Sequence, residues 1–455
     1  MLLGIQKLMV IFNSFNKNKD VILNILFSLI PLSFLIGNFV INLNVLFIIV
    51  FAFLIYNKKI FGIKLLLVDK VIISLFIFTF ITGIINNTLL TPNVGSGDYT
   101  ILIKTILYIR YLLLYFILRF LIEENKINFK WFFISSFIFS LFVSLDIFYQ
   151  FIFAKDIFGF EMVNSRKLSG PFGEELIAGG YLQRFSIFGF FIFPFFFKIK
   201  KTYLLLILVT LFLIYTVSII LSGNRMPLIL YLMTLSLILL FEKRVRKYFP
   251  IFLILISFVF YLLFTTNHNI TSNLGNIKKD GFRIVKIFIV DNFSKTSKVH
   301  FDDMPAYYKE FKTFYGTWLM NKYIGGGIRS FRYNCPQRKI VRDYVPPVEI
   351  KDIKNKIISC NTHPHNYYLE ILTDLGLIGF ILFFTIFIII IYNSLIKKYF
   401  LKSDLSSNEL IIPFIFIFIP EIFPLRTSGS FFSTASSTYI FLLILIIVAL
   451  SNKKT

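Results

Sequence analysis

The chain is built from repeated apolar runs, many of about 18 to 22 residues, which is long enough to cross the hydrocarbon core of a bilayer as a helix. Twelve such runs are found, at 21–40, 43–56, 69–86, 101–121, 131–153, 179–197, 202–221, 225–241, 249–265, 367–392, 409–425 and 433–450. Of the 455 residues, 57% are hydrophobic and only 16% are charged. That leaves too little polar surface to cover a soluble globule of this size. We therefore expect an all-α polytopic membrane protein with about twelve transmembrane helices.

Lysine and arginine gather in every second connection between these runs. The basic connections lie at 57–70, 126–130, 198–201, 243–247 and 397–402. The connections between them, such as 86–100 and 221–224, carry far fewer. Because basic loops stay in the cytoplasm, this alternation predicts that both termini are cytoplasmic. The net charge of +23 is spread over these short loops, so we expect membrane lipids rather than nucleic acid as partners.

One long polar segment divides the chain into three parts. Residues 1–265 hold the first nine predicted helices, 266–366 form a large loop between helices nine and ten, and 367–455 hold the last three. The alternation of charge places the large loop outside the cytoplasm, away from ATP and nucleotide sugars. The sequence has neither a phosphate-binding glycine loop with Lys-Ser/Thr nor an Asp-x-Asp pair, so no nucleotide, cofactor or metal is expected.

The middle of this loop has the pattern of an amphipathic helix. Asp302 and Pro305 suit its first turn, and the aromatic residues that follow, among them Tyr315 and Trp318, recur at helical spacing. The glycines 325–327 are expected to end it. Such a helix rests on the membrane surface or covers a cleft, or it packs on its own loop.

The only two cysteines, Cys335 and Cys360, both lie in this external loop. An oxidising compartment favours a disulfide between them, and closing a loop of about 25 residues contributes roughly 3 kcal/mol. The alternative is a pair of buried thiols. Zinc is not expected, because two cysteines near histidine lack the paired spacing of zinc sites.

A histidine-rich element closes the loop, and His365 is the candidate catalytic residue. Pro364 disfavours helix before it, so a helix is expected to begin near His365 or Asn366. His365 then shares a 4-3-4-3 face with Gly376 and Gly379, which allow another helix to approach closely. A helix N-terminus favours the neutral imidazole that a general base requires. The alternative is a histidine that only caps the helix.

Four arginines are candidates for binding an anion on the same side of the membrane. Arg225 opens a predicted span, Arg329 and Arg332 follow three glycines, and Arg426 lies in a Gly/Ser-rich turn. Arginines beside free helix N–H groups bind phosphate well. Together with a histidine they indicate a phosphate-bearing substrate. The alternative for each is an interfacial arginine that reaches towards lipid headgroups.

These motifs resemble the O-antigen ligase and O-antigen polymerase superfamily of bacterial envelope enzymes. The resemblance covers roughly 165–435. The elements that carry it are Ser222-Gly223-Asn224-Arg225, Ile324-Gly325-Gly326-Gly327 with Phe331-Arg332, His363-Pro364-His365-Asn366 with Leu369, Leu372, Gly376 and Gly379, and, for a subgroup, Ser169 to Glu175 and Pro424 to Thr434. The subgroup often carries a lysine near Arg329, which leaves the role of that arginine open.

The resemblance implies an enzyme of the bacterial inner membrane that acts on its periplasmic face. Such enzymes move a glycan from a polyprenyl diphosphate carrier (undecaprenyl diphosphate) without metal or nucleotide. Ligases pass it to a lipid A-core sugar in lipopolysaccharide biosynthesis, and polymerases pass it to another lipid-linked repeat. By position, His365 is the base on the acceptor hydroxyl. Arg225 and Arg332 match the family's diphosphate-binding arginines best, and Arg329 and Arg426 match less well.

Two other classes of protein remain open at this point. A transporter or flippase for lipid-linked glycans also has many spans and external arginines, and Asp146 and Asp374 inside predicted spans are consistent with it. Against it stands the large external loop, because transporter sites lie near the midplane in broken helices. A different polytopic glycosyltransferase needs acids in its first external loop, and the segment 38–43 has none.

Overall fold

The computed structural model describes residues 19–88, 99–162, 167–242, 246, 249–266, 275, 313–335, 360–400, 409–427 and 429–452. The longer helices are α2 (Lys19–Ser28), α3 (Ile30–Ile36), α4 (Asn38–Tyr56), α5 (Leu67–Thr88), α6 (Thr100–Tyr108), α7 (Arg110–Glu123), α8 (Phe129–Phe153), α9 (Ala178–Phe196), α10 (Lys201–Leu221), α11 (Arg225–Phe241), α12 (Phe249–Thr266), α18 (Tyr367–Ile390), α19 (Ile411–Glu421) and α20 (Thr434–Asn452). The described residues also contain a ten-residue π-helix, η10 (Ile391–Phe400), that follows α18, together with short helical turns and one isolated bridge.

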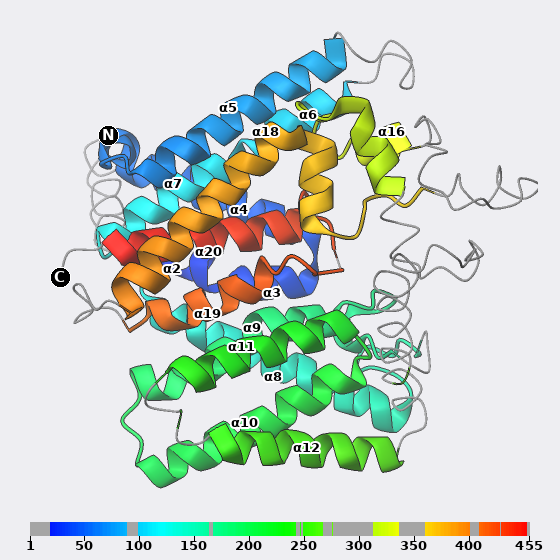
Figure 1. Cartoon of the computed structure of the whole chain (residues 1–455). Helices are drawn as coiled ribbons and strands as arrows, with labels where there is room; N and C mark the ends of the chain where they lie inside the picture. Colours follow the sequence, from blue (N-terminus) through cyan, green and yellow to red (C-terminus); the bar gives the residue numbers. More distant parts are fainter. Residues whose placement is uncertain are drawn as a thin grey trace, which may run out of the picture.

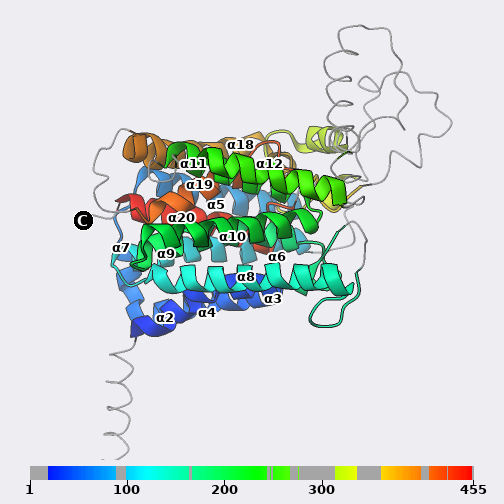
Figure 2. The ribbon, with the colours of Figure 1, turned by 90° about the horizontal axis from the view of Figure 1, so that it is seen from below.

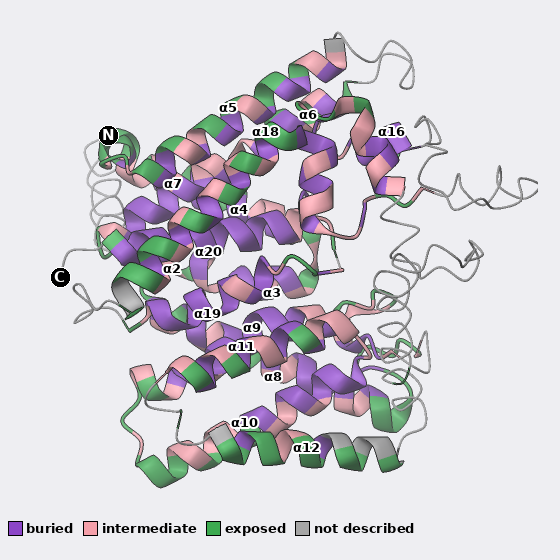
Figure 3. Cartoon of the chain, in the orientation of Figure 1, coloured by how far each residue is buried: buried purple, intermediate pink, exposed green. Residues whose placement is uncertain are grey.

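Seven of these helical segments are long and apolar enough to cross a membrane, which confirms an all-helical, multi-pass membrane protein. Three more apolar helices, α11, part of α12 and α19, are shorter. Large apolar side chains such as Phe39, Leu54 and Ile254 are about 70% exposed or more on the outside of the bundle (Figure 3). Lipid tails cover such surfaces at no cost. The count of twelve spans stays a prediction.

The first two predicted runs are joined by a tighter turn than the sequence suggested. The connection was expected near 38–43, but α3 ends at Ile36 and α4 already begins at Asn38. Gly37 makes the turn alone with φ of 128°, a conformation that residues with a side chain rarely adopt. Residues 38–43 are therefore part of α4 and not a loop. They offer no place for the acidic loop that the other class of polytopic glycosyltransferase requires.

The C-terminal helix α20 forms the centre of the bundle. It is buried along nearly its whole length (Figure 3) and packs against α7 and α19. Tyr111 and Phe441 stack across the contact between α7 and α20, with ring centroids 5.8 Å apart. The helices α8 to α12 form a second group beside it (Figure 1). Aromatic packing therefore stabilises the contacts that bring distant parts of the chain together.

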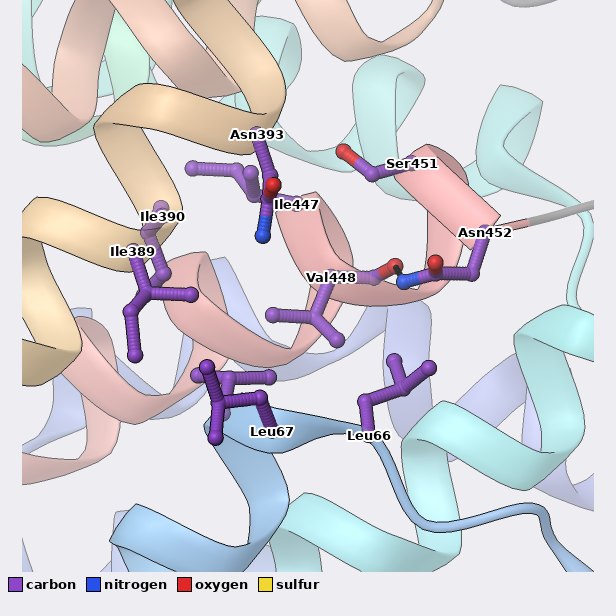
Figure 4. A pocket seen from close by; sticks show the side chains of 10 residues that line it. Leu66, Leu67, Ile389, Ile390, Asn393, Ile447, Val448, Ser451 and Asn452 are labelled. Carbon is purple, nitrogen blue, oxygen red and sulfur yellow. Dashed lines mark hydrogen bonds between the residues drawn. The ribbon is translucent and has the colours of Figure 1, made fainter. Parts of the chain in front are cut away.

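The two ends of the bundle differ. The first residues of α2 and the last residues of α20 lie at one end, which we call the terminal end (Figures 1 and 2). The short helix α16 (Phe331–Asn334) and the starts of α9, α11 and α18 lie at the other, which we call the site end. At the terminal end, α5, α18 and α20 surround a cavity of about 130 Å³, and its polar members are Asn393, Ser451 and Asn452 (Figure 4). Cytoplasmic placement of the terminal end stays a prediction.

Candidate functional site

The start of α18 is fixed by Asn366, directly after the candidate histidine. The Asn366 side chain accepts hydrogen bonds from the backbone N–H groups of Tyr368 and Leu369, at 2.9 and 3.1 Å, as an N-cap does. Its amide donates to the carbonyl oxygens of Pro424 and Arg426, at 2.7 and 3.0 Å. The helix therefore begins at Tyr367, close to the predicted position. His365 lies just outside it with φ of 51°.

The helix that follows is broken, which corrects the predicted continuous face. Gly376 has φ of 64° inside α18, and the segment Tyr367–Leu375 stands across the site end before the rest of α18 runs along the bundle (Figure 1). A Cβ at Gly376 would lie 2.3 Å from the carbonyl of Tyr323. Gly376 therefore admits the loop backbone rather than another helix. The apolar segment that is long enough to cross a membrane begins at Tyr367, and the boundary expected at 366/367 stays a prediction.

The loop 322–331 is hydrogen-bonded onto this break. Gly326 and Gly327 donate to the carbonyls of Thr373 and Asp374, at 2.9 and 2.7 Å. The Asp374 carboxylate accepts from the backbone N–H of Arg329 at 2.6 Å, and from the hydroxyl of Ser330 at 3.1 Å. The break in α18 exposes its own carbonyl groups, and the glycine loop satisfies them. The helix break and the glycine motif therefore form one structural unit.

The disulfide between Cys335 and Cys360 is present, which confirms the prediction from the cysteine count. Their Cα atoms are 6.0 Å apart. Arg332 lies three residues before one cysteine and His363 three residues after the other. The bridge therefore holds the arginine segment of the loop beside the histidine segment.

The predicted loop helix is observed only in part, since its first residues, 302–312, lie outside the described residues. Residues 313–318 are helical and Leu319–Asn321 form a 3-10 turn, so the helix ends before the glycines. Phe314, Phe331 and Cys335 form a small buried cluster, and Tyr315 and Trp318 pack against it together with Leu369 and Leu372 of α18. For the described residues, the helix packs on its own loop and on α18.

His363 and His365 are in contact, with ring centroids 4.3 Å apart. Burial is the main cause, and together with the electrostatic effect of His365, Arg332 and Arg329 it lowers the pKa of His363 to about 4. His363 is therefore neutral near pH 7. Its Nδ1 lies 3.0 Å from the Thr362 hydroxyl, and its Nε2 is buried without a hydrogen-bond partner. Two histidines and two arginines thus share one positively charged site.

The structure separates the four predicted arginines. Arg329 and Arg332 belong to the histidine cluster, and Arg332 is exposed, although Arg329 Nε also donates to the carbonyl of Phe432 at 3.1 Å. Arg225 is half-buried at the start of α11, at the site end but within the second group of helices. Arg426 is buried in an ion pair with Glu421 at 2.7 Å, and its contact with a diphosphate stays a prediction.

A buried charge network behind α18 was missed by sequence reasoning. Glu421, fully buried at the end of α19, pairs with Arg184 of α9 at 2.8 Å and with Arg426 at 2.7 Å. The hydroxyl of Tyr367 lies 3.3 Å from the same carboxylate, and the guanidinium of Arg426 is 4.6 Å from the Tyr367 ring. The one available signal was a glutamate inside an apolar run, because such charges are found paired.

A third carboxylate, that of Glu370, connects the first turns of α18 to the segment after α19. Glu370 accepts from the hydroxyl of Ser430 at 2.6 Å and from the backbone N–H of Phe431 at 2.5 Å. The segment after α19 is therefore attached to α18 at Asn366, Tyr367 and Glu370. These contacts hold the start of α18 in place, and His365 lies directly before that start.

The two acids that favoured a transporter have local roles. Asp374 binds the glycine loop, and Asp146 of α8 accepts from the backbone N–H of Ile157 at 2.8 Å. Ile157 lies in the connection after α8, at the site end. Among the described residues, no group of three or more His, Cys, Asp or Glu is placed to hold a metal ion.

The fold and the site define a multi-pass helical membrane protein with a cationic histidine site at one end of its bundle. A family model described as O-antigen ligase matches residues 208–384, which include α11, the glycine loop, the disulfide and the histidines. This match confirms the resemblance to the O-antigen ligase superfamily. No curated protein matches the chain significantly.

Proposed function

We propose that the chain is an O-antigen ligase that transfers a glycan from a polyprenyl diphosphate carrier to a lipid A-core sugar on the periplasmic face. The observation that carries this proposal is the site in which His363, His365, Arg329 and Arg332 lie together, next to the disulfide and outside the apolar part of α18. Cations at that position suit a diphosphate, and an imidazole suits an acceptor hydroxyl.

In this mechanism the acceptor hydroxyl oxygen attacks the anomeric carbon while the bond from that carbon to the carrier phosphate breaks. His365 takes the hydroxyl proton. Arg332, with Arg225 from α11, neutralises the charge that develops on the departing diphosphate. Because diphosphate is a good leaving group, positioning and charge neutralisation account for most of the lowering of the activation barrier. Direct displacement inverts the configuration at the anomeric carbon.

A surface-polysaccharide gel from a deletion strain tests this function. We expect long chains to disappear from lipid A-core while lipid-linked polymer accumulates. Single repeats on the core would instead assign the chain as a polymerase. Reconstituted protein that moves lipid-linked glycan across the bilayer without transferring it would assign a flippase, and would overturn the enzyme proposal.

Complementation of that strain tests the residues. His365→Ala and Arg332→Ala are expected to leave the long-chain ladder absent while the protein accumulates normally in the membrane. His268→Ala serves as the matched histidine control, because His268 lies outside the motifs that carry the family resemblance. Arg246, which is exposed in the connection between α11 and α12, is the matched arginine control. A full ladder from His365→Ala would refute the role of that histidine as the base.

A further inference from the structure

A cavity of about 850 Å³ lies between α9, α10, α11 and α12. Its lining includes the residues that end α9 and begin α10, and Ala178, the first residue of α9, is at the site end. A helix of 19 residues is about 28 Å long. The cavity therefore opens near the terminal end of the bundle, at the opposite end from the start of α18.

Two features of the sequence create this cavity. Pro194 lies inside α9 and removes one backbone hydrogen bond near its end, which loosens the last turn. The first ten residues of α10 contain no buried side chain, and its buried residues begin at Leu211. The first half of α10 therefore stands away from its neighbours, while its second half packs tightly.

The cavity has apolar walls and a basic rim. The walls carry aromatic and aliphatic side chains, among them Phe191, Leu208 and Phe252. The rim carries Lys198, Lys200 and Lys201, all exposed, with Glu242 the single acidic residue of the lining, so the lining has a net charge of +2. A further lysine, Lys130 of α8, lies 5.1 Å from the ring centroid of Phe197 at the same place.

We propose that this cavity binds an anionic phospholipid, with acyl chain between α9 and α10 and phosphate at the lysine rim. Apolar cavities are poorly filled by water, and an empty one loses the contacts of every atom that lines it. Acyl chains are the apolar groups available within a bilayer. Basic pockets between transmembrane helices on the cytoplasmic side bind anionic headgroups, and the lysine distribution predicts that this end is cytoplasmic.

Native mass spectrometry of the full chain from mixed micelles tests the proposal, with phosphatidylglycerol and phosphatidylcholine as probes. We expect phosphatidylglycerol to be retained in preference. A lysine near an anionic headgroup contributes about five-fold in affinity, so K198A/K200A/K201A is expected to weaken retention by up to about 100-fold. K58A/K59A/K64A is the matched control, because it removes three exposed lysines from another connection at the terminal end. That control is expected to retain the lipid.

A second variant tests the cavity itself. Leu208→Trp adds volume to the wall and leaves every charge in place, so it is expected to displace the acyl chain and lower retention. Equal retention by the wild-type chain and both variants would overturn the proposal, as would equal retention of the two phospholipids. Displacement of phosphatidylglycerol by equimolar polyprenyl phosphate would assign the cavity to the carrier instead. A dimer lost in Leu208→Trp would assign it to a second copy of the chain.

Discussion

Replacing Glu421 by glutamine tests whether the buried charge network holds the histidine segment in place. Both oxygens of this carboxylate are used, at 2.8 Å by Arg184 and at 2.7 Å by Arg426, and its side chain is fully buried. Glutamine keeps the shape but removes the charge, and it turns an N–H group towards one of the arginines. Removal of one partner from a buried ion pair costs about 3 to 5 kcal/mol, and we expect a destabilisation of that size.

The measurement is unfolding of the purified chain in mixed micelles, followed by the fluorescence of its two tryptophans, Trp131 and Trp318. Glu409→Gln is the matched control, because Glu409 is exposed just before α19 and its replacement should change stability by less than about 0.5 kcal/mol. Adding Arg426→Gln to Glu421→Gln removes one of the two uncompensated cations. The double variant is therefore expected to be more stable than the sum of the single effects predicts.

A free energy of unfolding for Glu421→Gln within about 1 kcal/mol of the wild-type value would refute the proposed role of the buried ion pairs. Simple additivity in the double variant would also refute it, because the two charges would then not interact. If Glu421→Gln abolishes the polysaccharide ladder at normal protein levels, Glu421 also positions the site, through Tyr367 and Asn366. Both of these residues are attached to the segment that contains Arg426.

Three further predictions concern the loop and the helix break. Because the pKa of His363 is lowered to about 4 in the folded chain, the unfolded chain binds the proton more tightly, and stability falls as the pH drops from about 6.5 to 4. His363→Asn should flatten this dependence, by at most about 3 kcal/mol in unfolding titrations at the two pH values. The double serine variant of Cys335 and Cys360 should lose about 3 kcal/mol, and an unchanged unfolding midpoint would contradict this. Gly376→Ala should destabilise the chain by more than about 1 kcal/mol, because of its positive φ and the nearby carbonyl, whereas Gly180→Ala in α9, with open space around it, should not. Equal effects of the two glycine variants would show that the break in α18 tolerates a side chain.

Several parts of the site were predictable because they depend on local properties. The helical membrane class followed from hydropathy, the disulfide from two cysteines in an external loop, and the helix start from the proline before His365. The division of the arginines was not predictable. Arg329 and Arg426 look alike as external arginines. Glu421 lies only five residues before Arg426, but the sequence does not show that this pair is buried together with Arg184, which is 237 residues from Glu421 in the chain.

The sequence by itself determined which segments are apolar enough for a bilayer, which loop contains the histidines, and which family the motifs resemble. The tertiary structure decided where α18 breaks, because a glycine between two helical turns is compatible with either a straight or a bent helix. The break depends on a loop that supplies backbone donors at Gly326 and Gly327. The tertiary structure also decided where α10 stands away from its neighbours. Hydropathy is a property of each segment, whereas ion pairs, loop docking and cavities depend on the distances between segments.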